Sequence, residues 1–419
     1  PAGAGKSSLL AKFDEGGTLA GGKVTYLATT AKAAEVLQKD GVDARAVASF
    51  LLSEKSQQAA AGGRVVVDET SMLGHREARD LLAVGKKLNF KFIFVGDPMQ
   101  HGSVARGAFM RLLSEKGTIQ PIRLTKILRQ KDPAYRAAAQ MFSEGRAAEG
   151  FDALHRLGWV SENPDPGERH RQMAADYLDT LHACRRWQDV LVIAPTHAEA
   201  RAVTAEIRSQ LRSAGKLGEE RTFTRLAAVD TSLAERGQAL TYRPGDVLVF
   251  HQNAKGFAKG DRLVVADPAK VPLAEAAKFS VYREETIPLA VGDVLRLTGT
   301  VQTLGSRPRV LKNGMAHAVA GFTEAGNIRL DTGDVISKNA GMFRHGLVET
   351  SLGAQGRTVR QVILGMAAAM GQAANMQQLY VSATRAWEGV RVYADDADSV
   401  RRAAERDSRR DSAIHSLGC

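Results

Sequence analysis

The sequence contains few cysteines and no long apolar run. Cys184 and Cys419, the two cysteines in 419 residues, cannot build a disulfide framework, which favours a reducing compartment. Neither has a metal-ligand spacing, and the ten histidines include no His-x-His pair, which argues against a structural zinc site. No apolar stretch reaches the length of a membrane span, and no signal peptide is visible.

Basic residues are in excess. The formal net charge is +11 and the isoelectric point is near 9.7, which favours a polyanionic partner, nucleic acid first. A generally basic protein is the alternative, and charge alone does not decide between the two. The length allows two or three domains, and 44% hydrophobic with 25% charged residues is ordinary for a globular protein.

The chain begins with "PAGAGKSS", which matches a phosphate-binding loop that lacks its first glycine. Gly3 and Gly5 allow backbone N–H groups to turn toward a phosphate, Lys6 adds a positive charge, and the Ser7 hydroxyl suits Mg²⁺. The following "SSLLAKF" is expected to be a helix whose N-terminal end faces the same anion. Because the strand before such a loop is missing, we expect a fragment cut inside the motif. The predicted nucleotide-binding residues here are Gly3, Ala4, Gly5, Lys6, Ser7 and Ser8.

A second acidic site follows a buried strand. Residues 65–67 form an apolar run, and Asp68 and Glu69 come directly after it, where α/β sheets place ligands. We expect Asp68 to hold Mg²⁺ and Glu69 to polarise the attacking water. A further strand over 92–95 leads to Gln100, a candidate sensor of the terminal phosphate or the water.

The strand expected over 24–28 ends in a Thr-Thr turn before a helix. Thr29 and Thr30 are candidate contacts to phosphates, including a nucleic-acid backbone. An ordinary helix N-cap explains them equally well at this stage.

The second half of the chain repeats this pattern of a strand, a polar turn and a helix. "DVLVIAPTHAEARAVTAEI", from residue 189, parallels "VTYLATTAKAAEVL", a weak internal duplication that two similar α/β cores would explain. Between residues 222 and 340 the sequence pattern changes to short predicted strands with recurring Gly-Asp turns. This pattern predicts an all-β insertion built as a small barrel.

Nine segments together resemble superfamily 1 helicases of the RecD-like branch. The order and spacing are most similar to the helicase region of MobF-type (TraI/TrwC) relaxase–helicases of conjugative plasmids, and the resemblance covers nearly the whole chain. Two departures are Thr384-Arg385 where Ser-Arg is usual, and Thr29-Thr30 where a proline usually precedes the threonine. In chain order the segments are "PAGAGKSS", "LATTAKAA", "AVASFL", "VVVDETSM", "VGDPMQHGSV", "LTKILRQKDP", "VLVIAPTHAEAR", "ETSLGAQGRT" and "YVSATRAWEG".

The resemblance implies an α/β fold with two RecA-like parallel-sheet cores and a small, SH3-like all-β barrel inserted into the second core. The expected domains are residues 1–150 for the first core, 151–221 and 341–398 for the second, 222–340 for the insertion and 399–419 for a charged tail.

The same resemblance implies ATP hydrolysis coupled to unwinding of DNA, with 5′ to 3′ polarity on single-stranded DNA. ATP and Mg²⁺ are the expected cofactors, with Ser7 and Asp68 at the metal. Arg129 and Arg385 are expected to reach the γ-phosphate as arginine fingers; outside the motifs both would be ordinary structural arginines. Gly356 is placed near the nucleotide. Thr29, Thr30, Ser49, Thr196, Thr350, Ser351 and Gln355 are the candidate DNA contacts.

Because only 6% of residues are aromatic, backbone contacts are expected to dominate DNA binding, with little sequence preference and strong salt dependence. The resemblance implies a cytoplasmic protein and makes other conjugation proteins candidate partners. Two alternatives stay open at this stage, a P-loop ATPase that does not unwind DNA and a DNA-loading module without catalysis. A viral RNA helicase is disfavoured by "MQHGSV" and the insertion.

Overall fold

The computed structural model describes residues 2–19, 22–103, 109–115 and 121–407. The chain forms two compact units, Pro1–Gln210 with Val348–Cys419, and Leu211–Leu347. Of the expected charged tail, residues 408–419 lie outside the described residues. Among the described residues, no helix has both the length and the apolar character needed to cross a membrane.

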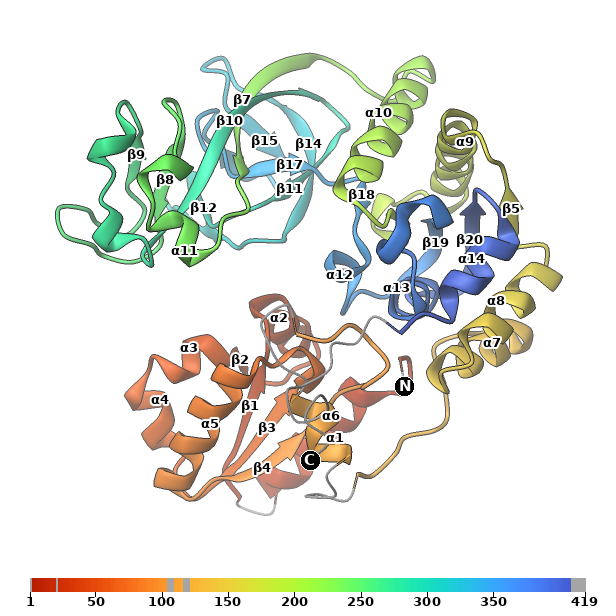
Figure 1. Cartoon of the computed structure of the whole chain (residues 1–419), viewed down its shortest axis with the longest axis horizontal. Helices are drawn as coiled ribbons and strands as arrows, with labels where there is room; N and C mark the ends of the chain where they lie inside the picture. Colours follow the sequence, from red (N-terminus) through yellow and green to blue (C-terminus); the bar gives the residue numbers. More distant parts are fainter. Residues whose placement is uncertain (1, 20–21, 104–108, 116–120, 408–419) are drawn as a thin grey trace. The chain divides into compact units, whose positions relative to one another are not determined.

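The first unit contains two parallel sheets, and the first has the strand order β2-β1-β3-β4 (Figure 1). The run of three valines forms the fully buried centre of β3, as a strand covered on both faces requires. Residues of α3 and α5 pack in the core on one face, and residues of α1 and α2 pack on the other. The bounds are α1 Lys6–Leu19, β1 Val24–Ala28, α2 Ala31–Lys39, β2 Ala44–Ala46, α3 Val47–Leu51, α4 Glu54–Ala59, β3 Arg64–Asp68, η1 Thr70–Met72, α5 His75–Leu88, β4 Lys91–Phe94 and α6 Phe109–Glu115.

The second sheet has the order β18-β6-β19-β20-β5, and all its pairs are parallel. The bounds are α7 Pro133–Ser143, α8 Ala147–Arg156, β5 Val160–Glu162, α9 Pro166–Cys184, η2 Trp187–Asp189, β6 Val190–Ile193, α10 His197–Ser213, β18 Val348–Glu349, α12 Ser351–Ala354, β19 Val359–Gly365, η6 Ala368–Ala373, α13 Met376–Ala383, β20 Ala386–Ala394 and α14 Ala397–Ala404.

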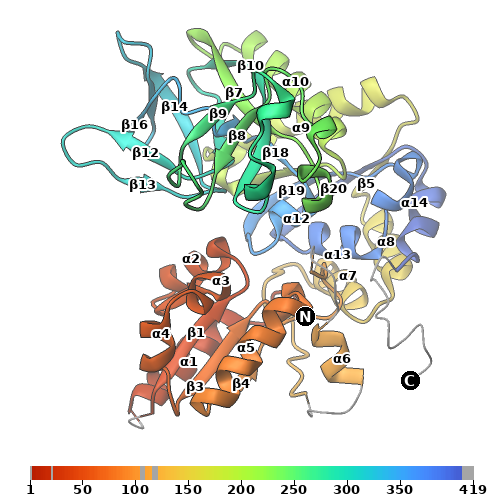
Figure 2. The ribbon, with the colours of Figure 1, turned by 60° about the vertical axis from the view of Figure 1, so that its left-hand side comes forward.

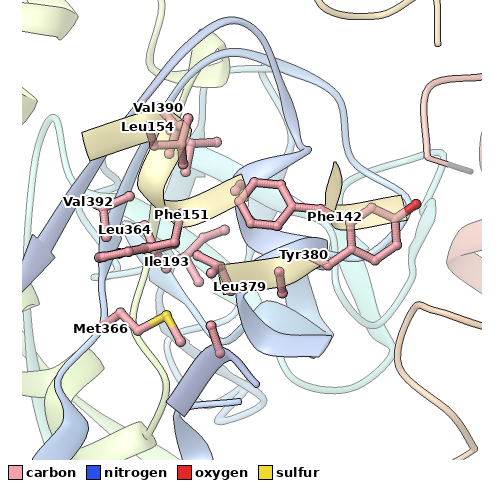
Figure 3. Close-up of a cluster of buried hydrophobic side chains, with 14 of the residues drawn as sticks. Phe142, Phe151, Leu154, Ile193, Leu364, Met366, Leu379, Tyr380, Val390 and Val392 are labelled. Carbon is pink, nitrogen blue, oxygen red and sulfur yellow. The ribbon is translucent and has the colours of Figure 1, made fainter. Parts of the chain in front are cut away.

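Helices α7 and α8 pack their apolar sides into the core of the second sheet. Phe142 and Phe151 lie in one buried cluster with Leu364 and Val392 of the sheet and with Tyr380 of α13 (Figure 3). The expected domain boundary at residue 150 falls inside α8. The segment before α7 therefore leads directly into the second core.

The second unit is antiparallel. One sheet has the order β7-β10-β8-β9 and the other β13-β12-β16-β15-β14-β11-β17 (Figure 2). One buried cluster contains residues of both sheets, and a second contains residues of β8 and β10. In the Gly-Asp turns that contain Asp246 and Asp293, the aspartate side chain closes the turn. Asp246 accepts a hydrogen bond from the N–H of Arg243, and Asp293 accepts one from the N–H of Ala290. The bounds are β7 Glu220–Ala228, α11 Leu233–Arg236, η3 Ala239–Thr241, β8 Val247–Phe250, β9 Arg262–Val264, η4 Pro268–Lys270, η5 Leu273–Glu275, β10 Phe279–Ala290, β11 Val294–Leu297, β12 Val301–Leu304, β13 Val310–Leu311, β14 Ala316–Phe322, β15 Ile328–Leu330, β16 Val335–Ile336 and β17 Phe343–His345.

Two parallel-sheet cores with an antiparallel insertion confirm the expected α/β fold class.

Candidate active site

The glycine-rich loop adopts the conformation that phosphate binding requires. Gly3 and Gly5 have φ values of 75° and 77°, which glycine adopts without strain. Helix α1 begins at Lys6, so its N-terminal N–H groups and positive dipole end lie at the loop. The Gly3 carbonyl accepts hydrogen bonds from the backbone N–H groups of Leu128 (2.9 Å) and Arg129 (3.2 Å). This contact places Arg129 beside the loop.

The other predicted loop residues differ in exposure. Ala4 is buried and Ser8 is exposed. Ser7 lies in α1, but its side chain falls outside the described part of the structure, so its role at the metal stays a prediction.

Asp68 is the last residue of β3, and Glu69 follows it in the left-handed conformation (φ 52°, ψ 38°). Asp68 is 8% exposed, and among the described residues its Oδ1 has no hydrogen-bond partner. Burial and then the neighbouring Glu69 charge raise the pKa of Asp68 to about 6, while Lys6 opposes the rise. A buried carboxylate oxygen without a hydrogen-bond partner among the described residues suits a bound cation.

Gln100 lies in a buried polar network that links the two parallel-sheet cores. Its Nε2 donates to Asp97 Oδ2 (2.9 Å), and the same oxygen accepts from the hydroxyl of Tyr380 on α13 (2.6 Å). Gln100 Oε1 is buried with no partner among the described residues, which leaves an acceptor available for a water or another donor. The Tyr380 hydroxyl in turn accepts from the backbone N–H of Ala2 in the loop (2.7 Å).

Arg129 and Arg385 come from distant segments, and a hydrogen bond joins Arg129 to the residue before Arg385. Arg129 Nη1 donates to the carbonyl of Thr384 (2.8 Å), which immediately precedes Arg385. Arg385 is buried, and its Nε donates to the carbonyl of Val381 (2.9 Å). Within the described part of the chain, no carboxylate forms an ion pair with either guanidinium. Burial and then the charge of Arg385 lower the pKa of Arg129 to about 9, so an anion between them would relieve both effects.

The turn after β18 brings further predicted residues to the site. Gln355 donates from Nε2 to Glu69 Oε2 (3.3 Å), and Gly356 follows with φ 79°. The Thr350 hydroxyl accepts from Gly353 N and caps α12. Ser351 is buried, and its hydroxyl bonds to Gln378 and, at 2.6 Å, to His101 Nε2.

The remaining candidate DNA contacts lie at the ends of strands or on a helix surface. Thr30 is the N-cap of α2, as the structural alternative expected, and Thr29 donates to the Glu69 carbonyl at 3.4 Å. Thr196 accepts from the N–H of Glu199 at the start of α10 (3.1 Å). Ser49 is exposed on α3. Whether these hydroxyls contact DNA stays a prediction.

Sequence reasoning did not single out Asp97, Gln130 or Tyr380 and assigned His101 no catalytic role, yet each bonds to a residue of a distant segment. All four stand inside the quoted segments, so the signal was present. Their partners lie more than 240 positions away along the chain, and no local pattern identifies them.

Comparison with known proteins supports the same class. Residues 1–165 match the family described as AAA domain. A conjugal transfer protein TraA of Rhizobium radiobacter is 26% identical over 257 residues, and a probable conjugal transfer protein TraA of Sinorhizobium fredii is 26% identical over 274 residues. The matches cover 60% and 64% of this chain but only 22% and 24% of those proteins. The chain thus spans less than a quarter of the relatives' length.

Among solved structures, Bacteroides Pif1 bound to ssDNA aligns with 100% of this chain and 91% of its own, with a TM-score of 0.52 and 14% identity. At this identity the likeness shows the fold. The fold, the match to the AAA domain family and the relatives together support the assignment to superfamily 1 helicases. This is the class that the motifs indicated, so the resemblance is confirmed. By their names, both relatives are conjugal transfer proteins.

Proposed function

We propose that this chain is an ATP-dependent translocase and helicase on single-stranded DNA, and that it is the helicase part of a conjugal transfer protein. The observation that carries the proposal is the hydrogen bond from Arg129, which lies beside the glycine-rich loop, to the carbonyl of Thr384, the residue immediately before Arg385. Arg385 belongs to the second core, so an arginine reaches the nucleotide from a separate sheet. That arrangement serves a motor that couples hydrolysis to movement between cores.

The residues present fit a nucleotide with Mg²⁺. Lys6 and the loop N–H groups would hold the phosphates, and the unpartnered Oδ1 of Asp68 would hold the ion together with Ser7. When bound, the ion supplies positive charge to the phosphate oxygens. These roles were expected from the motif, and the orphaned oxygen of Asp68 is independent support for them.

Glu69 would accept the proton of the attacking water, and the free Oε1 of Gln100 would orient that water or the phosphate contacts. Arg129 and Arg385 would stabilise charge that develops on the transferred group. Because the Glu69 carboxylate also accepts from Gln355, the base is in contact with the turn that carries the predicted DNA residues.

DNA would lie along the strand ends where Thr29, Thr196 and Thr350 are found, with 5′ to 3′ movement implied by the resemblance. The solved Pif1 structure contains ssDNA by its description, and the curated relatives act in conjugal transfer by their names. Both agree with single-stranded DNA as the substrate and with other conjugation proteins as candidate partners.

The test is ATP turnover of the chain with and without single-stranded DNA, compared with Glu69→Gln. The proposal expects turnover that rises with DNA and is abolished in the variant. ATP turnover that does not change when DNA is added would indicate a P-loop ATPase that does not unwind DNA. DNA binding without any turnover would indicate a loading module.

A further inference from the structure

The segment that follows Arg129 is fastened to the turn that carries Arg385. Gln130 is fully buried, and its Nε2 donates to the carbonyls of Thr384 (3.3 Å) and Ala386 (2.8 Å). These two carbonyls stand immediately before and after Arg385. One side-chain amide therefore clamps the backbone on both sides of the second arginine.

Neighbouring contacts hold the clamp in place. The Gln130 carbonyl accepts from Arg136 Nε (2.9 Å), and the backbone N–H of Lys131 donates to the Trp387 carbonyl (3.0 Å). The Tyr135 hydroxyl bonds to the Ala383 carbonyl and lies 3.4 Å from that of Ala386. All of these bonds join the segment from Gln130 to Arg136 to itself or to the turn 383–387.

Burial of the Gln130 side chain has an unfavourable free-energy contribution that packing alone does not explain. Gln130 Oε1 is buried and has no hydrogen-bond partner among the described residues. An unpaired buried amide oxygen is unfavourable, so an apolar side chain of similar size would serve a purely structural role better. What the amide provides is two N–H donors on one planar group, matched to two carbonyls one residue apart on either side of Arg385.

We propose that Gln130 is a positioning residue that joins Arg129 and Arg385 into one two-arginine unit, so that both guanidiniums meet the transferred phosphate together. The inference rests on the proposed function and deepens it. Arg129 donates through its own Nη1 to the same Thr384 carbonyl that accepts from Gln130, so both residues hold the backbone immediately before Arg385. Arg129 thus contacts the loop through the Gly3 carbonyl and the turn that carries Arg385 through the Thr384 carbonyl.

The kinetic test uses Gln130→Ala, Gln130→Glu, Arg385→Ala and the double variant Gln130→Ala/Arg385→Ala in the full chain. Gln130→Glu keeps the volume but removes both donors. Each Gln130 variant is expected to lower kcat by about 10²-fold, the effect of a small misplacement of a catalytic group, with the KM for ATP changed less than about threefold. Because Gln130 acts through the arginines, the double variant is expected to be no slower than Arg385→Ala alone.

Gln377→Ala is the matched control, since Gln377 is also a buried glutamine of the second core but its Nε2 bonds to Asp407. It is expected to keep kcat. Normal kcat in Gln130→Glu, or a double variant whose losses multiply, would overturn the proposal and leave Gln130 a structural residue.

A binding measurement separates this proposal from the proposed function. ADP with aluminium fluoride mimics the transferred phosphate, and its affinity relative to ADP alone reports the two-arginine unit without turnover or DNA. Wild type is expected to prefer the fluoride complex, and Gln130→Ala to lose that preference while keeping its affinity for ADP. An equal preference in both, or none in wild type, would overturn the two-arginine unit. If wild type shows the preference but no DNA-stimulated turnover, the proposed function alone fails.

Discussion

Gln355 donates a hydrogen bond to the Glu69 carboxylate at 3.3 Å, although the two residues stand 286 positions apart. Glu69 directly follows the strand that ends at the predicted metal ligand Asp68, and Gln355 follows the helix of the predicted DNA-contact turn. A residue expected at the DNA therefore touches the residue expected to activate water. This contact is a direct route by which DNA could alter hydrolysis.

Gln355→Ala is expected to lower the stimulation of ATP turnover by single-stranded DNA, with a smaller effect on turnover without DNA. The reason is that the variant removes the link between the turn and the base while leaving the base in place. Steady-state turnover across a DNA titration measures both quantities. Stimulation equal to that of wild type would show that the hydrogen bond between Gln355 and Glu69 does not transmit the effect of DNA to ATP hydrolysis.

Glu69→Gln is expected to reduce kcat by about 10²- to 10⁴-fold while ATP and DNA still bind, because the amide keeps the size of the carboxylate but cannot accept the proton. Turnover and equilibrium binding together test this. Glu54→Gln, at an exposed position on α4, is the control and is expected to behave as wild type. A Glu69→Gln variant with near-normal turnover would remove Glu69 from the proposed role.

Lys6→Ala and Arg385→Ala are expected to fail in different ways. Lys6 meets phosphate in the ground state, so its loss should weaken ATP binding as well as turnover. Arg385 should contribute mainly to the transition state, so its loss should lower kcat by about 10³-fold with a smaller change in ATP affinity. Measured kcat and nucleotide Kd distinguish the two patterns. Equal losses of affinity would contradict the separation of roles.

Gly3→Ala is expected to abolish turnover and lower the melting temperature. A Cβ there would lie 2.6 Å from the Cβ of Arg129, and the φ of 75° adds strain. Gly62→Ala is the control because Gly62 has a similar φ of 71° but nothing within 4 Å of the added atom. Gly62→Ala should lower the free energy of unfolding by about 1 kcal/mol, from conformational strain alone, and should keep normal turnover. Equal effects of the two substitutions would mean that the approach of Arg129 to the loop is not required.

His101 is expected to make stability depend on pH. Burial and then the charge of Arg385 lower the pKa of His101 to about 4, below its ordinary value of 6.5. Between these values the unfolded chain binds the proton and the folded chain does not, so the free energy of unfolding falls as the pH drops through this window. From pH 7.5 to pH 5 the loss is about 2 kcal/mol.

Urea unfolding of wild type and His101→Gln at the two pH values measures this contribution. The variant should show the shallower pH dependence, because glutamine does not titrate and can still donate to the Ser351 hydroxyl. The same slope in both proteins would assign the pH dependence to other groups.

The sequence predicted the elements that its local patterns encode. The strand expected over 24–28 is β1, and the valines of 65–67 are the buried centre of β3. Hydrophobic runs and the glycine spacing are local signals, so they needed no knowledge of the fold. Together with the motif order they were enough for the fold class.

The contacts that assemble the site could not be predicted in the same way. The packing of α7 against the second sheet and the bonds of Gln130 to Thr384 and Ala386 join distant segments. A buried glutamine in a polar motif looks like any exposed one until its partners are known. The roles of the individual site residues therefore stay predictions that the experiments above address.

Strand separation tests the central claim most directly. A duplex with a 5′ single-stranded tail and a matched duplex with a 3′ tail are mixed with the chain, ATP and Mg²⁺, and release of the displaced strand is followed over time. We expect ATP-dependent separation of the 5′-tailed duplex, little of the 3′-tailed one, and none with Arg385→Ala. ATP hydrolysis that rises with DNA but separates neither duplex would contradict helicase activity, and separation of the 3′-tailed duplex alone would contradict the polarity.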